Sequence, residues 1–214
     1  MPNQLSRITG ILALILSTCA VPGAWAGAPT DQLREGIERV FKILRDPDMA
    51  GDKNVLRRQA AVLAAAGTVF DFGEMAKRAL GQHWAARTSA ERTQFIALFT
   101  DLIQHSYINK VDQHSGAKVT FTNETIDGDL AAVRTAIPLN NGKEMPLEYR
   151  MHKTDALWQV YDLSIDGISL LSNYRAQFNK IIRIDSYETL VTKLKSHQTE
   201  FSAPAASPSG KPVR

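Results

Sequence analysis

Apolar side chains recur every three or four positions through the first half of the chain, a period that predicts amphipathic helices. The first helix is expected to begin near Thr30 and to end before Pro47. Its apolar face holds Leu33, Ile37, Val40, Phe41 and Leu44. Two more helices are expected over 54–66 and 71–80, with Gly81 placed to end the second.

A fourth helix begins at a capping box formed by Thr88 and Glu91, whose side chains satisfy free backbone N–H groups. The apolar residues that follow cover about half of the helix circumference, wider than the stripe of an ordinary surface helix. They are Phe95, Ile96, Leu98, Phe99, Leu102, Ile103 and Tyr107. We therefore expect this helix to bury two sides, or to bury one side and line a cavity with the other.

From Lys118 onward the period changes to two, which indicates strands with one buried face. The alternating segments are 118–122, 133–137, 145–151 and 158–165. Turn residues between them are Asp127-Gly128, Asn140-Asn141-Gly142 and Thr154-Asp155. The pattern predicts an antiparallel meander of about four strands.

Two helices are expected after the strands, one following Gly167 and one opening at Asp185 and Glu188. The order of helices, strands and helices predicts an α+β fold, with helices packed over one face of a curved antiparallel sheet in an NTF2-like cone. We expect one domain over 27–201. Residues 202–214 are rich in Pro, Ala and Ser, a composition that buries too little apolar surface to offset ordering entropy, so a disordered tail is predicted.

The first residues have the pattern of an export signal. Arg7 precedes an apolar run from Ile8 to Cys19, and Ala24-Trp25-Ala26 offers the small-x-small pattern of a signal peptidase site. The run is shorter than the ~20 residues that span a bilayer, so a cleaved signal peptide over 1–26 is expected. Because Leu16 to Cys19 loosely resembles a lipobox, lipoprotein processing at Cys19 stays open as an alternative. Cys19 is the only cysteine, so the exported product would have no disulfide.

Charge and motifs exclude several classes of function. The formal net charge is +3 and the basic residues are scattered, which argues against a nucleic-acid partner. The sequence contains no Gly-x-Ser-x-Gly elbow, no His-Glu-x-x-His and no glycine-rich phosphate loop. We expect no catalytic residue, no metal and no cofactor.

Asp162 and Asp166 are the residues that keep an enzymatic alternative open. An α+β cone of this kind can host an isomerase or dehydratase that uses a buried Asp with a Tyr. The structural interpretation is that Asp162 pairs with an arginine such as Arg175, or caps the turn that follows it.

Large apolar residues are more numerous than one thin layer of helices on a sheet requires, which fits either a core or a ligand pocket. Ordered blocks of sequence add to this observation. They are Phe70-Asp71-Phe72, Met75-Ala76, Ala79-Leu80-Gly81, Trp84, Thr88-x-x-Glu91-Arg92, Trp158, Tyr161-Asp162-Leu163, Ile165-Asp166-Gly167-Ile168-Ser169-Leu170, Asn173-Tyr174-Arg175 and Gln177-Phe178. These blocks resemble the MlaC (toluene-tolerance) family of Gram-negative bacteria, and the similarity runs from about Asp31 to Leu194.

The resemblance implies a periplasmic carrier that buries the acyl chains of a phospholipid and maintains outer-membrane lipid asymmetry without a cofactor. The partners it implies are the MlaD-type ring of an inner-membrane ABC transporter and an outer-membrane MlaA-type lipoprotein with its porin. Two alternatives are an enzyme acting on an apolar small molecule and an adaptor that binds no lipid.

The predicted lipid contacts are apolar side chains on elements that should converge. They are Phe72, Met75, Leu80, Trp84, Phe95, Phe99, Leu102, Tyr107, Val133, Ile137, Leu147, Tyr149, Val160, Leu163, Ile165 and Tyr174. Because burying a charge is costly, we expect no ion pair deep among them.

Overall fold

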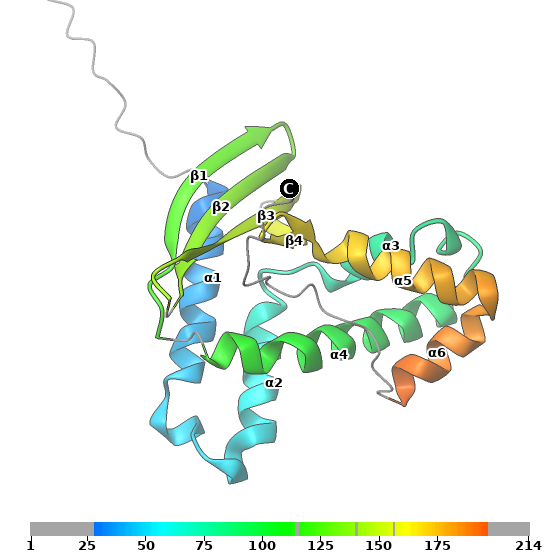
Figure 1. The fold of residues 1–214 in the computed structure, drawn as a ribbon, viewed down its shortest axis with the longest axis horizontal. Coiled ribbons are helices and arrows are strands. Elements are labelled where there is room, and N and C mark those ends of the chain that lie inside the picture. Colours follow the sequence, from blue (N-terminus) through cyan, green and yellow to red (C-terminus); the bar gives the residue numbers. More distant parts are fainter. Residues whose placement is uncertain (1–27, 114–115, 140, 156, 197–214) are drawn as a thin grey trace, which may run out of the picture.

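A computed structural model describes residues 28–113, 116–139, 141–155 and 157–196 (Figure 1). The expected signal peptide over 1–26, including Cys19, and the expected tail over 202–214 lie outside the described residues. The helices are α1 (Ala28–Leu44), α2 (Val55–Ala66), α3 (Phe72–Leu80), α4 (Ser89–Gln113), α5 (Leu170–Ile184) and α6 (Tyr187–Lys195), with the short 3-10 turns η1 (Pro47–Met49), η2 (Asp52–Asn54) and η3 (Gly81–His83). The strands are β1 (Thr120–Asp127), β2 (Leu130–Pro138), β3 (Glu144–Thr154), β4 (Leu157–Ile165) and β5 (Ile168–Ser169).

Side-chain caps fix the starts of α3 and α4. The capping box before α4 is confirmed: the Thr88 N–H donates to Glu91 Oε2 at 2.7 Å and the Glu91 N–H donates to Thr88 Oγ1 at 3.3 Å. The Asp71 carboxylate accepts the Glu74 N–H at 2.8 Å and so begins α3. α4 itself continues past Tyr107 to Gln113.

The strands pair in chain order as an antiparallel sheet, which confirms the predicted α+β meander. The short β5 was not predicted; it returns along the end of β4 and pairs Ile168 with Ile165. Asp166 and Gly167 form this tight turn with φ values of 51° and 79°, in the left-handed region where glycine is at ease and Asp is tolerated.

The segment before α3 joins the sheet on the far side of β4 from β3. Val160 donates its N–H to the Val69 carbonyl at 2.7 Å, and the Asp71 N–H donates to the Val160 carbonyl at 3.0 Å. This parallel bridge between Phe70 and Val160 places the start of α3 against the sheet.

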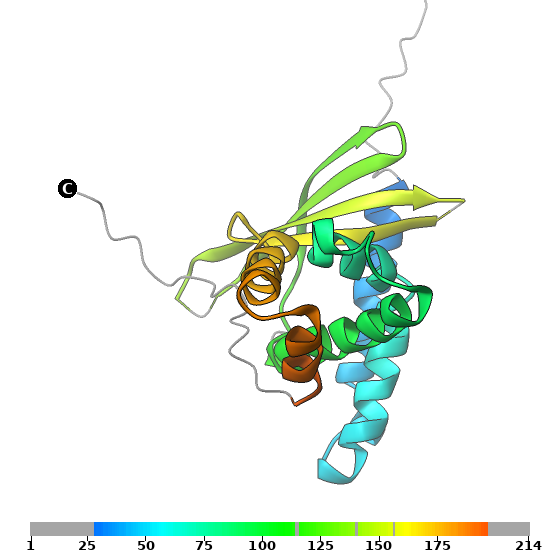
Figure 2. The same cartoon turned by 90° about the vertical axis from the view of Figure 1, so that its right-hand side faces the viewer.

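The helices pack in two groups, one against a face of the sheet and one beside β4 (Figures 1 and 2). α1 packs on one face of the sheet, and Gly36 permits the close approach because a side chain there would collide with Val69. α3, α4, α5 and α6 pack together beside β4. Among the described residues, no helix is both long and apolar enough to cross a membrane.

Candidate functional site

The buried apolar residues form two separate clusters. The helix cluster contains Met75, Ala76, Ala79, Leu80, Phe95, Phe99, Leu102, Leu170, Leu171, Tyr174, Phe178, Tyr187, Leu190, Val191 and Leu194. The sheet cluster contains Leu33, Val69, Ala131, Val133, Ile137, Leu147, Tyr149, Met151, Trp158 and Val160. Phe70 is partly buried and packs against both clusters, so it lies at their boundary.

The predicted lipid contacts divide between these clusters. In or against the helix cluster are Phe72, Met75, Leu80, Trp84, Phe95, Phe99, Leu102, Tyr107 and Tyr174. In or against the sheet cluster are Val133, Ile137, Leu147, Tyr149, Val160, Leu163 and Ile165. The structure therefore brings together two groups of these residues, each around its own centre.

The aromatic rings of the helix cluster pack densely. Phe99 meets the Tyr174 ring edge to face with centroids 5.8 Å apart, and Phe95 meets Phe178 in the same way at 5.8 Å. These four side chains have 0% exposed surface. In this conformation they are core residues, and a role for Phe95, Phe99 or Tyr174 as a lipid contact stays a prediction.

Other predicted contacts keep accessible surface at the margins of the clusters. Phe72, which stacks on Phe70 with centroids 6.0 Å apart, is half-buried, as are Leu163 and Ile165 on β4. Further half-buried residues of this kind, not among the predicted contacts, are Phe70, Ile96, Ile103, Phe121 and Met145. The sequence signal that could have found Phe70 is the Phe-Asp-Phe block, in which both rings flank a helix cap.

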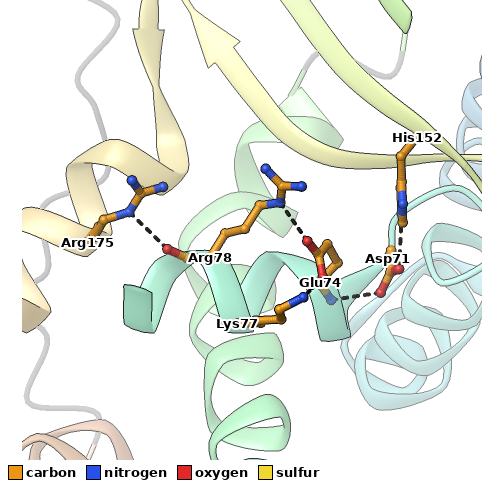
Figure 3. Close-up of polar contacts among 6 residues, drawn as sticks. All are labelled: Asp71, Glu74, Lys77, Arg78, His152 and Arg175. Atoms are coloured by element: carbon orange, nitrogen blue, oxygen red, sulfur yellow. Dashed lines mark hydrogen bonds and ion pairs between the residues drawn. The ribbon is translucent and has the colours of Figure 1, made fainter. Parts of the chain in front are cut away.

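A line of polar contacts attaches α3 to the sheet (Figure 3). His152 on β3 lies 3.1 Å from Asp71 Oδ2, while the other carboxylate oxygen caps α3. The Tyr161 ring meets the His152 ring edge to face at 5.8 Å, and the Arg78 guanidinium stacks over Tyr161 at 4.1 Å. Asp71 thus caps α3 and also contacts His152 on β3.

The same line continues along α3 to α5. Glu74 Oε1 accepts from Arg78 Nε at 2.8 Å, and Glu74 Oε2 accepts from Lys77 Nζ at 3.0 Å. Arg175 Nε on α5 donates to the Arg78 carbonyl at 2.9 Å (Figure 3). We name His152, Asp71, Glu74, Arg78 and Arg175 the α3 tether, because together they link the sheet, α3 and α5.

Asp162, the residue that kept an enzymatic interpretation open, caps the turn into α5. It accepts from Ser169 Oγ at 2.7 Å and from the Leu171 N–H at 3.2 Å, and is 5% exposed. The arginine beside Asp162 is Arg150, whose Nη1 lies 3.9 Å from Asp162 Oδ2. Arg175 instead donates to the Arg78 carbonyl on α3. The capping interpretation is confirmed, and Arg175 was the wrong partner.

Several tyrosine hydroxyls are buried within the apolar clusters. Burial raises the pKa of Tyr149 to about 12. Burial also raises the pKa of Tyr107 and of Tyr174. Across the described residues, no three His, Cys, Asp or Glu side chains group so that they could hold a metal.

Comparison with known proteins gives the family. The sequence profile of the MlaC protein family matches residues 34–196. The chain belongs to the MlaC family. A member from Haemophilus influenzae, the intermembrane phospholipid transport system binding protein MlaC, is 25% identical over 128 residues, which are 58% of this chain and 60% of that protein.

The fold also matches a solved structure, the phospholipid-binding protein from Ralstonia solanacearum in complex with a phospholipid. The TM-score is 0.69 at 23% identity, and the match covers 82% of this chain and 99% of the other. This likeness confirms the α+β fold.

Proposed function

We propose that this chain is a periplasmic carrier that takes up a phospholipid and passes it between the outer and inner membranes, so that outer-membrane lipid asymmetry is maintained. The observation that carries the proposal is the family match over residues 34–196. The names of the Haemophilus relative and of the Ralstonia protein, which was solved with a phospholipid, support it.

The acyl chains would lie at the boundary between the sheet cluster and the helix cluster. Half-buried apolar side chains flank each cluster: Phe70 packs against both, Phe72 against the helix cluster, and Leu163 and Ile165 against the sheet cluster. A ligand that covers this surface removes it from water, which stabilises the complex in proportion to the apolar area buried. The fully buried residues Phe95, Phe99 and Tyr174 would support these contacts or join them if the helix layer moves.

A carrier lowers the free-energy barrier that a phospholipid faces when it leaves a membrane through water. A phospholipid with two chains has about 30 methylene groups, and each costs roughly 0.8 kcal/mol to expose to water, so unassisted escape faces a barrier on the order of 20 kcal/mol. A protein that offers the chains an apolar site removes most of this barrier. No cofactor and no covalent step is needed.

The docking partners would set the direction of net lipid transport. The head group stays in water because burying its charge is costly. The proposed partners are the MlaD-type ring of an inner-membrane ABC transporter and an MlaA-type outer-membrane lipoprotein with its porin. Since binding is reversible, net transport depends on the energy that these partners supply.

The experiment is transfer of a fluorescent phospholipid from donor to acceptor vesicles by the purified chain. We expect transfer to rise in proportion to the protein added. Leu163→Glu, which puts a charge on the inner face of β4, should reduce transfer at least about tenfold, because a buried carboxylate is costly. Thr125→Glu, on the exposed outer face of β1, is the matched control and should transfer lipid like the wild type. Folded wild-type protein that accelerates no transfer would contradict the proposal.

A further inference from the structure

Thr135 is a buried polar residue on the mostly apolar inner face of the sheet. This residue lies on β2 within the row formed by Val133 and Ile137, and only 1% of its surface is exposed. Among the described residues, its Oγ1 is buried and has no hydrogen-bond partner. Most buried polar groups in proteins are paired, so an unpaired hydroxyl in an apolar cluster needs an explanation.

The fold alone does not account for a threonine at this position. A buried hydroxyl without a partner destabilises the folded state, whereas valine has the same shape and carries no such penalty. Tyr149 on β3 is a polar neighbour, since its side-chain interaction with Thr135 lowers its pKa against the larger rise that burial causes. The two oxygens nevertheless do not meet the geometry of a hydrogen bond. A pair of adjacent hydroxyls therefore has donor capacity left over.

The surroundings of Thr135 indicate which part of a ligand would reach it. Its cross-strand neighbours are Leu147, which is buried, and Phe121, which is half-buried. The Arg34 guanidinium on α1 stacks over the Phe121 ring at 4.2 Å from the centroid. The cation and the aromatic ring are thus both half-buried, and the buried Thr135 hydroxyl lies on the strand next to the ring. A phospholipid has the order of phosphate, glycerol ester and acyl chain.

We propose that Thr135, together with Tyr149, donates a hydrogen bond to an ester carbonyl of the bound lipid, so that the site selects ester-linked over ether-linked chains. The inference rests on the proposed function, because it assigns a polar subsite within the same lipid site. Phe121, the cross-strand neighbour of Thr135, would shift as the lipid enters, and Arg34 would lie beside the phosphate.

The experiment is a competition between two phosphatidylglycerols with identical chains and head groups, one diester and one diether. The diether lacks both carbonyl oxygens, so the pair differs in the acceptor that Thr135 would use. The delipidated chain is incubated with equal amounts of both in mixed vesicles, and the bound lipids are counted by mass spectrometry. Circular dichroism melting checks that each variant is folded.

We expect the wild type to prefer the diester about fivefold, the size of one net hydrogen bond. Thr135→Val should bring the ratio close to one while its melting temperature is unchanged or higher. Tyr149→Phe should reduce the preference in part, and Thr125→Val, on the exposed outer face, should keep it. Equal uptake of both lipids by the wild type, or an undiminished preference in folded Thr135→Val, would overturn the inference and leave the carrier proposal standing. Uptake of neither lipid by the wild type would contradict the carrier proposal and the inference with it.

Discussion

At the scale of single residues, burial separates two roles that hydrophobicity alone does not. Phe99 and Phe72 both belong to the helix cluster region, yet Phe99 is fully enclosed by other rings while Phe72 keeps accessible surface. A periodic pattern identifies both as inward-facing. It contains no information on whether the space beyond is filled by another side chain or is open to a ligand. For that reason the predicted lipid contacts include both fully buried and half-buried residues, and the pattern could not distinguish core from pocket.

The buried tyrosines predict a loss of stability at alkaline pH. Burial raises the pKa of Tyr149 to about 12 from an ordinary value of 10.0. As pH rises above 10, the unfolded chain loses this proton first, so the folded state loses up to about 1.4 kcal/mol per pH unit until about pH 12. Below pH 10 this contribution is fully present.

The measurement is the free energy of unfolding in urea from pH 9 to pH 12 for the wild type and for Tyr149→Phe. The variant should lose stability less steeply above pH 10, by the share that one titrating group supplies. Parallel curves for the two proteins would show that Tyr149 does not titrate as described.

At the scale of elements, the features that depend on a few neighbouring residues could be predicted from the sequence. The capping box at Thr88 and Glu91 and the turns between strands depend on a few neighbouring residues, and all of the long strands follow. β5 was missed because its turn uses Asp166 at positive φ, a conformation that sequence rarely reveals for a residue other than glycine. The bridge from Phe70 to Val160 was missed because it joins segments far apart in the chain.

The α3 tether predicts that Asp71 contributes to the stability of the whole fold. Asp71→Ala removes the cap of α3 and the contact with His152 together. Loss of a helix cap costs about 0.5–2 kcal/mol, so the melting temperature should fall by several degrees. Asp71→Asn keeps an oxygen for the cap and should retain most of the stability.

Calorimetry on the two variants and the wild type measures these effects. His152→Phe is the matched test of the strand end of the tether, since it removes the imidazole but leaves the cap. An Asp71→Ala protein that melts at the wild-type temperature would mean that α3 is held by apolar packing alone.

At the scale of the whole molecule, the apolar core is divided into two clusters that meet at Phe70. One cluster is built on the sheet and α1, the other on α3 to α6, and Phe70 packs against both. The α+β fold and the family could be predicted from order, period and ordered sequence blocks. The division of the core could not, because it depends on how the helix layer sits beside β4 rather than over the sheet face.

The most direct test of the carrier claim is to ask what the protein holds. The full chain, including residues 1–26, is produced in a Gram-negative host, purified without detergent, extracted with organic solvent and analysed by mass spectrometry against a weighed amount of protein. The account predicts phospholipid at near-stoichiometric amounts, with a mixture of head groups because most of the binding free energy lies in the chains. An extract of folded protein that contains no phospholipid would contradict it.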